Sequence, residues 1–122
     1  MTAPLLAPDP AAVLTKAVRA AAERLGLRNR ELAEVLGTSE ASISRLSRGR
    51  VLSPEAKEGE LALLFLRLFR SLDALMGGDE EQSRAWFDAP NADLDGTPRE
   101  LVHRVEGLVD VVQYLDAMRG RL

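Results

Sequence analysis

Apolar side chains recur along the chain at steps of three, four and seven residues, which is the spacing of one face of an α-helix. Leu14, Val18 and Leu25 follow this spacing near the start of the chain. A second series lies near its end and comprises Val105, Leu108, Val109, Val112, Leu115 and Met118. No stretch alternates apolar and polar residues, as a half-buried β-strand does. The pattern therefore predicts an all-α protein.

Capping residues predict where helices begin and end. Asp9 followed by Pro10 marks the start of a first helix, because Asp caps helix N-termini and Pro is favoured at the first helical position. Gly26 is expected to end that helix. By the same signals, we expect a fourth helix to begin at Ser53-Pro54 and to end at Gly77-Gly78.

The C-terminal part of the chain contains two further helix starts. Asp79 predicts the N-cap of a short helix that runs to about Asp88, and the turn-rich segment 89–96 follows it as a loop. Thr97-Pro98-Arg99-Glu100 then combines a Thr N-cap, Pro at the first helical position and Glu at the third. We expect two helical stretches after this start, with a break at Gly107.

The expected fourth helix is apolar on nearly all sides between Leu61 and Phe69. A helix of this kind is normally buried, and a chain of 122 residues has little interior in which to bury it. Two interpretations follow with equal weight. Either this is the central core helix, or a second protomer or another partner covers part of its surface.

Residues 29–50 have the spacing of a helix-turn-helix, with helices expected over about 29–36 and 39–47. The small Ala33 allows the two helices to cross closely, and Gly37 supplies the tight turn, where a positive φ is often needed. Four apolar residues are expected to face the core: Leu32, Leu36, Ile43 and Leu46.

The opposite face of the second of these helices carries short polar side chains and an arginine, which suits a helix that reads the DNA major groove. Arg45 can reach guanine O6 and N7 as a bidentate donor, and Arg48 and Arg50 are placed to contact phosphates. The candidate DNA-binding residues are Asn29, Glu40, Ala41, Ser42, Ser44, Arg45, Arg48 and Arg50. The alternative is a three-helix fragment with solvated polar faces, since Thr38 stands where an apolar residue is usual.

Charge is distributed unevenly between two predicted domains, residues 1–52 and residues 53–122. The whole chain has a net charge of −3, but the first domain carries +3 and the second −6. We therefore expect a DNA-binding domain followed by an acidic domain with another role. Because the positive surplus is small, we expect modest affinity for DNA per protomer and the formation of a homodimer.

The residue types that build catalytic and metal sites are scarce. The chain contains no Cys, which excludes disulfides and thiolate metal sites, and its single His103 is expected at the surface. No organised set of nucleophile and base is evident, so we expect neither a metal site, nor a cofactor, nor enzymatic activity. Residues 1–10 lack the features of a signal peptide, and the apolar run 61–66 is too short to span a bilayer. We expect a cytoplasmic protein without membrane contact.

Both domains carry a family resemblance. Residues 27–49, LRNRELAEVLGTSEASISRLSRG, resemble the helix-turn-helix of Xre/Cro-type regulators. The ordered motif Trp86-Phe87-Asp88-Ala89-Pro90-Asn91, Leu94-Asp95-Gly96, Pro98-Arg99-Glu100-Leu101 and Gly107 resembles the toxin-binding domain of Xre/MbcA/ParS-type antitoxins. Together these similarities cover about residues 20–120.

The resemblance implies an antitoxin of a type II toxin–antitoxin system. The partner would be a RES-domain toxin, which belongs to a class of enzymes that act on NAD⁺. The antitoxin would cover the active site of the toxin and, as a complex, bind operator DNA and repress its own operon. Residues 53–122 would then be a toxin-binding and dimerisation domain, and the assembly a homodimer or a toxin–antitoxin hetero-oligomer.

Two segments are candidates for toxin contact. The loop 91–97 is acidic and is expected to present Asn91, Asp93 and Asp95 to basic groups of the toxin; the alternative is an ordinary solvated turn. The C-terminal end is basic, and the resemblance places it near the active site of the toxin. There Arg119, Arg121 and Leu122 could plug a cleft that takes a pyrophosphate. Alternatively, the two arginines only complement the dipole of the last helix.

Trp86 has two interpretations as well. We favour a core aromatic that fixes the Pro90-Asn91 corner against the fourth helix over a residue in direct contact with the toxin. Two rival functions also stay open for the whole chain. One is a stand-alone transcriptional repressor of phage type, which uses its second half only to dimerise. The other is a protein-binding adaptor whose helix-turn-helix has lost its affinity for DNA.

Overall fold

The computed structural model describes residues 9–120, and within this range the regular elements are helices. They are α1 (Pro10–Arg24), α2 (Asn29–Leu36), α3 (Glu40–Ser44), the short 3₁₀ helix η1 (Arg45–Arg48), α4 (Lys57–Leu75), α5 (Glu80–Asp88), α6 (Pro98–Leu101) and α7 (Val105–Gly120). The all-α prediction is confirmed. None of the helices in the described range is long and apolar enough to cross a lipid bilayer.

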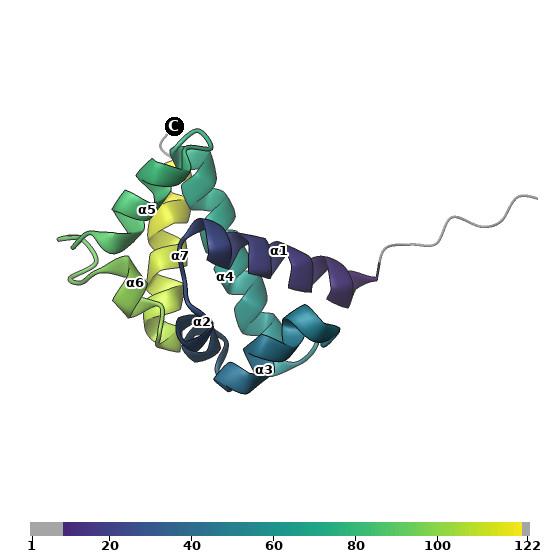
Figure 1. The fold of residues 1–122 in the computed structure, drawn as a ribbon. Helices are drawn as coiled ribbons and strands as arrows, with labels where there is room; N and C mark the ends of the chain where they lie inside the picture. Colours follow the sequence, from purple (N-terminus) through teal and green to yellow (C-terminus); the bar gives the residue numbers. More distant parts are fainter. Residues whose placement is uncertain (1–8, 121–122) are drawn as a thin grey trace, which may run out of the picture.

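Helix α4 forms the centre of the fold. Figure 1 shows it running through the middle of the molecule, with α7 beside it and α1 crossing it. Phe65, Leu68 and Leu72 are fully buried on this helix. Most of the apolar surface of α4 is thus covered by its own chain, as expected for a central core helix. Leu63 is the exception among the large apolar residues of this helix, since it remains 47% exposed.

Several predicted helix ends are present in the structure. The Asp9 carboxylate accepts a hydrogen bond of 3.0 Å from the backbone N–H of Ala11, and Pro10 occupies the first turn of α1. The Asp79 carboxylate caps α5 through the N–H of Gln82, also at 3.0 Å. Gly37 ends α2 with a φ of +67°. These ends are set by local hydrogen bonds, which a capping residue makes with its immediate neighbours.

The predicted start of α4 at Ser53-Pro54 is wrong. The helix begins at Lys57, and the preceding residues form a turn in which the N–H of Ala56 donates to the carbonyl of Ser53. This turn folds back onto the first turn of α4 at Gly59. A Cβ atom at Gly59 would lie only 1.7 Å from the carbonyl oxygen of Ser53, so the close approach requires glycine.

The predicted break at Gly107 is also wrong. The chain leaves the helical path at residues 102–104, between α6 and α7, and Gly107 lies inside α7. There a Cβ atom would lie 2.0 Å from the carbonyl oxygen of Leu101, so the glycine lets α7 pack against the end of α6. The buried face of α7 also differs from the predicted one, because Val105 is 58% exposed and Val111 is buried instead.

Candidate functional site

The helix-turn-helix predicted for residues 29–50 is formed by α2, α3 and η1. The turn after α2 closes with a hydrogen bond of 2.9 Å from the N–H of Thr38 to the carbonyl of Ala33. Ala33 itself is buried, at 3% exposure, where α2 meets the core. The four residues predicted to face the core are all buried: Leu32, Leu36, Ile43 and Leu46.

The second helix of the motif is shorter than predicted. It begins after Ser39, whose hydroxyl accepts the N–H of Ser42 at 3.1 Å, but the α-helical part ends at Ser44 and the chain continues as η1. The hydroxyl of Ser47 donates to the freed carbonyl of Ser44 at 2.9 Å. Gly49, with a φ of +102°, then ends η1. The expected helix over 39–47 is therefore one α-helical segment followed by a tighter 3₁₀ turn.

Most of the candidate DNA-binding side chains lie on the outer face of this motif. Asn29, Glu40, Ala41, Arg45 and Arg48 are exposed, whereas Ser42 and Ser44 are half-buried. The Arg45 guanidinium donates to the Ser42 hydroxyl at 3.1 Å, so its side chain lies along the face of α3.

Arg50 is held differently. Its guanidinium forms an ion pair with Glu58 of α4 at 2.5 Å, and the two side chains are 27% and 20% exposed. A phosphate contact by Arg50 would have to compete with this carboxylate.

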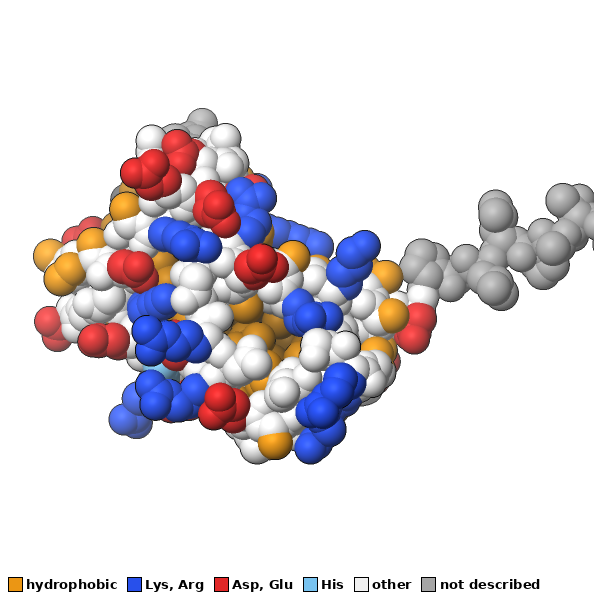
Figure 2. Space-filling view, in the orientation of Figure 1, with side chains coloured by type: hydrophobic (Ala, Val, Ile, Leu, Met, Phe, Trp, Pro, Cys, Tyr) orange, Lys and Arg blue, Asp and Glu red, His pale blue; other side chains and the backbone are white. Residues whose placement is uncertain are grey.

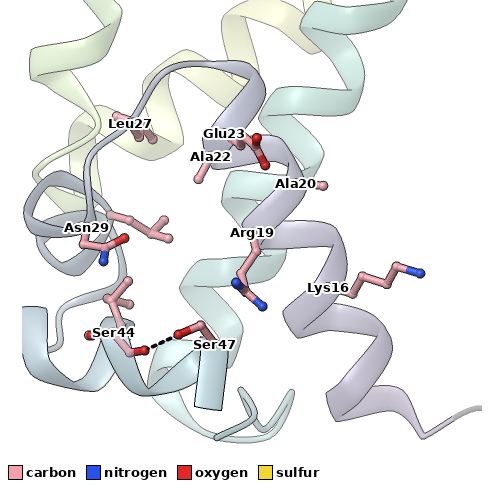
Figure 3. A pocket seen from close by; sticks show the side chains of 11 residues that line it. Lys16, Arg19, Ala20, Ala22, Glu23, Leu27, Asn29, Ser44 and Ser47 are labelled. Carbon is pink, nitrogen blue, oxygen red and sulfur yellow. Dashed lines mark hydrogen bonds between the residues drawn. The ribbon is translucent and has the colours of Figure 1, made fainter. Parts of the chain in front are cut away.

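A hollow of about 480 Å³ separates α1 from α2, α3 and η1 on the same face. Figure 3 shows Arg19 extending from α1 toward Ser47 of η1, with Asn29 and Ser44 on the opposite wall. In Figure 2 this side of the molecule carries Lys and Arg side chains around an apolar floor. Lys16 lies on the rim of the same hollow. Lys16 and Arg19 are two cations that were not among the predicted DNA-binding residues. Their spacing of three residues on one exposed face of α1 was the available signal.

The loop after α5 is a tightly hydrogen-bonded turn. Asn91 and Gly96 pair through two backbone hydrogen bonds of 2.9 and 3.3 Å, and the side chain of Asn91 accepts the N–H of Leu94 at 3.1 Å. Asp95 has a φ of +54° and is the one residue other than glycine with a positive φ in the range 9–120. The loop therefore presents its acidic groups in a defined geometry.

Trp86 anchors this loop to α7. Its ring stacks on that of Tyr114, with centroids 6.2 Å apart and an interplanar angle of 19°. The Tyr114 hydroxyl donates to the carboxylate of Asp93 at 3.1 Å. Trp86 is half-buried against the core, as favoured, but its stacking partner lies in α7, and not in the fourth helix as we expected.

The basic C-terminal end is only partly within the described residues. The Arg119 guanidinium donates to the hydroxyl of Ser71 in α4 at 3.3 Å, in the last turn of α7. Arg121 and Leu122, the other two residues of the predicted plug, lie outside the described residues.

Arginines of α5 and α6 bind the carbonyl end of α1. Arg84 donates to the carbonyl oxygens of Glu23 and Arg24 at 2.9 and 2.7 Å, and Arg99 donates to that of Gly26 at 2.6 Å. These guanidinium groups add side-chain donors to carbonyls at and just beyond the end of the helix, where donors within the helix run out. The helix-turn-helix and the C-terminal helices are thereby joined by direct polar contacts.

His103 takes part in the same junction. Its Nδ1 lies 2.5 Å from a carboxylate oxygen of Glu34 in α2, and its side chain is only 27% exposed. His103 is therefore half-buried at this junction, and it lies in the turn after α6 and not in the helix itself. Within residues 9–120 there is no group of three or more His, Asp or Glu side chains arranged to hold a metal ion.

Two family models match the chain in succession. Residues 4–67 match the antitoxin Xre-like helix-turn-helix domain, and residues 71–121 match the antitoxin Xre/MbcA/ParS C-terminal toxin-binding domain. A similar chain occurs in the crystal structure of the MbcT–MbcA toxin–antitoxin complex of M. tuberculosis. It shares 26% sequence identity at a TM-score of 0.66, and the match covers 90% of this chain and 96% of that chain. No curated protein matches the sequence.

Proposed function

Because the chain belongs to the family of antitoxins that join an Xre-like helix-turn-helix domain to an Xre/MbcA/ParS toxin-binding domain, we propose that it neutralises a RES-domain toxin acting on NAD⁺ and represses its own operon. The observation that carries the proposal is the succession of both domains in one chain. It is supported by the similarity, over nearly the full length, to a chain from a toxin–antitoxin complex. The role is one of binding, without enzymatic activity and without a cofactor.

The loop 91–97 is the first proposed contact with the toxin. Its backbone bridge and the bond from Tyr114 to Asp93 fix the loop before binding, which lowers the entropy cost of ordering it in a complex. Asp93 and Asp95 present carboxylates on the acidic half of the chain. They suit a basic surface on the toxin.

The C-terminal end is the second proposed contact. Arg119, Arg121 and Leu122 would enter a cleft of the toxin that binds the pyrophosphate of NAD⁺, where cationic groups are favoured. Deletion of 121–122 should weaken neutralisation, while it leaves the bond between Arg119 and Ser71 intact. Deletion of 119–122 should weaken neutralisation further. Full neutralisation by both truncated proteins would leave the arginines with only their role at the helix dipole.

Operator binding is proposed for residues 1–52, through the face of α3 and η1. Arg45 would contact a base edge, and the exposed cations Arg48, Lys16 and Arg19 would contact phosphates. The hollow between α1 and η1 would then lie beside the DNA backbone. A specific complex with the promoter upstream of its own gene is expected, in contrast to an adaptor that has lost its affinity for DNA.

A homodimer is proposed through the groove between α1 and α4. Leu63 and Val13, which are 47% and 54% exposed, line a hollow of about 440 Å³ together with Leu14, Ala17 and Leu66. A two-fold interface would bring this apolar patch against the same patch of a second copy. Leu63→Glu should yield monomers by light scattering, whereas Val105→Glu, which changes an exposed apolar residue of α7, should leave the dimer intact.

The test of the main proposal is co-purification with the product of the neighbouring gene. The expected result is a stable complex, and a partner that stops growth only when this chain is absent. A chain that purifies alone as a dimer, binds its own promoter and protects cells from no neighbouring gene product would favour the stand-alone repressor.

A further inference from the structure

The guanidinium of Arg99 lies where the N-terminal part of the molecule, which contains the helix-turn-helix, meets the C-terminal part, which contains α5 and α6. Its Nη2 donates to the carbonyl of Gly26, between α1 and α2, at 2.6 Å. Its Nε lies 3.3 Å from a carboxylate oxygen of Asp88 in α5 and 3.5 Å from one of Glu31 in α2. The guanidinium also sits over the ring of Phe87, 5.9 Å from its centroid, which holds it in place. A single N–H group is thus faced by one carboxylate from each part.

The two carboxylates differ in what else they contact. Glu31 is only 16% exposed, and its other oxygen accepts the N–H of Arg28 at 3.1 Å, which caps the start of α2. Asn29, a candidate DNA-binding residue, is the first residue of that helix. Asp88 is 51% exposed and lies three residues before the loop 91–97, which we propose to contact the toxin. Arg99 therefore connects the start of α2 to an acidic group that a partner can reach.

We propose that Arg99 relays occupation of Asp88 to the DNA-binding face. At 3.3 and 3.5 Å both contacts are ion pairs, and one N–H group can form a well-aligned hydrogen bond with only one of the two carboxylates, so Asp88 and Glu31 compete for the Nε–H of Arg99. When a cationic group of a bound toxin pairs with Asp88, this N–H turns fully to Glu31 and strengthens the cap of α2. The toxin-bound antitoxin then holds Asn29 more firmly and binds operator DNA more tightly. The inference rests on the proposed function of both surfaces.

The expected effect follows from the kind of interaction involved. Ion pairs that are partly exposed to solvent change equilibria by about two- to fivefold, and the relay cannot exceed the difference between its two arrangements. We therefore expect operator binding to tighten about two- to fivefold when Asp88 is neutralised. By linkage, operator DNA should tighten toxin binding by the same factor.

The relay can be tested without the toxin, because Asp88→Asn removes the charge that competes with Glu31. Binding of a fluorescein-labelled duplex spanning the promoter upstream of its own gene would be measured by anisotropy for the full chain. Asp88→Asn should bind two- to fivefold more tightly than the unchanged chain. Asp95→Asn removes the same charge from an exposed position without contact to Arg99, and corrects for the general gain from a less acidic protein.

A double-mutant cycle separates a relay from a merely structural role. In the background of Arg99→Gln, the gain from Asp88→Asn should disappear. In the background of Arg84→Gln, which removes another arginine that binds the end of α1, the gain should persist. Circular dichroism would show that the variants are folded.

Two outcomes overturn the relay and one overturns the proposed function instead. If Asp88→Asn and Asp95→Asn bind the duplex equally, or if the gain survives in Arg99→Gln, Arg99 transmits nothing to the DNA face. If the unchanged chain does not bind the duplex in preference to an unrelated sequence, the proposed operator binding itself fails.

Discussion

Replacing Gly107 with alanine should lower the stability of the protein, although alanine is the better helix former. Gly107 lies in the first turns of α7, where a Cβ atom would come within 2.0 Å of the carbonyl oxygen of Leu101 and 2.7 Å of its carbonyl carbon. That oxygen already accepts the N–H of Arg104 at 3.2 Å, in the turn between α6 and α7. The obstruction is backbone, so no side chain can rotate away to relieve it.

The magnitude follows from two opposing terms. Alanine favours a helix over glycine by about 1 kcal/mol, while forcing an extra methyl group into a packed site costs about 1–3 kcal/mol, and more where the backbone must move. Because the contact at Gly107 is with backbone, the upper part of this range applies. We therefore expect Gly107→Ala to reduce the free energy of unfolding by about 2 kcal/mol. At roughly 4 °C per kcal/mol for a chain of this size, Tm should fall by about 8 °C.

The assay is urea and thermal unfolding followed by circular dichroism. Gly120→Ala is the matched control, because it lies in the same helix and, within residues 9–120, no atom beyond its chain neighbours and its own helical backbone is within 4 Å of the added methyl group. This control should be as stable as the unchanged protein, or slightly more so. If Gly107→Ala matches Gly120→Ala in stability, the close packing of α7 on the end of α6 does not hold in solution.

Three further predictions concern the proposed DNA-binding face and the loop 91–97. Arg45→Ala should weaken operator binding by about 1–3 kcal/mol in an anisotropy titration, if Arg45 is a bidentate donor to a guanine; an unchanged affinity would remove that contact. Arg19→Ala should reduce the steepness with which the logarithm of the DNA-binding constant falls with the logarithm of salt concentration by about 1, because one phosphate contact is lost. Arg67→Ala, on α4 away from the hollow, is the control and should leave this slope unchanged. Trp86→Ala should lower the free energy of unfolding, measured in urea, by about 2–3 kcal/mol. This is less than the roughly 3–5 kcal/mol lost with a fully buried aromatic, because Trp86 is half-buried. A loss under about 1 kcal/mol would mean that the stack on Tyr114 does not anchor the loop.

Local signals were sufficient to predict much of the fold. Asp9, Gly37 and Asp79 each act on residues within a few positions of themselves, and each sits at a helix end in the structure. The spacing of apolar residues in the helix-turn-helix likewise identified its buried face, because the period of a helix determines which side chains share that face.

The misplaced boundaries near Gly59 and Gly107 share one physical cause. Ser53-Pro54 predicts a helix start and Gly107 predicts a helix break, but Gly59 and Gly107 both lie inside helices and allow a close approach between backbone segments. That approach depends on how the preceding turn folds over the helix. No local pattern encodes it, so the start of α4 and the boundary between α6 and α7 were misplaced.

The junction between the two parts could not be predicted for a related reason. Arg99 binds the carbonyl of Gly26, which is 73 positions away in the chain. Arg84 reaches the carbonyl of Glu23 over 61 positions. Exposed and structural arginines have the same appearance in a sequence, and only the positions that α5 and α6 take near the end of α1 distinguish them.

The most direct test of the central claim is the NAD⁺ content of cells that express the neighbouring gene, with and without this chain. The account predicts that NAD⁺ falls when the neighbouring gene is expressed alone, and that co-expression of this chain restores both NAD⁺ and growth. If NAD⁺ falls equally in the presence of this chain, at matched levels of both proteins, the chain does not neutralise a toxin that acts on NAD⁺.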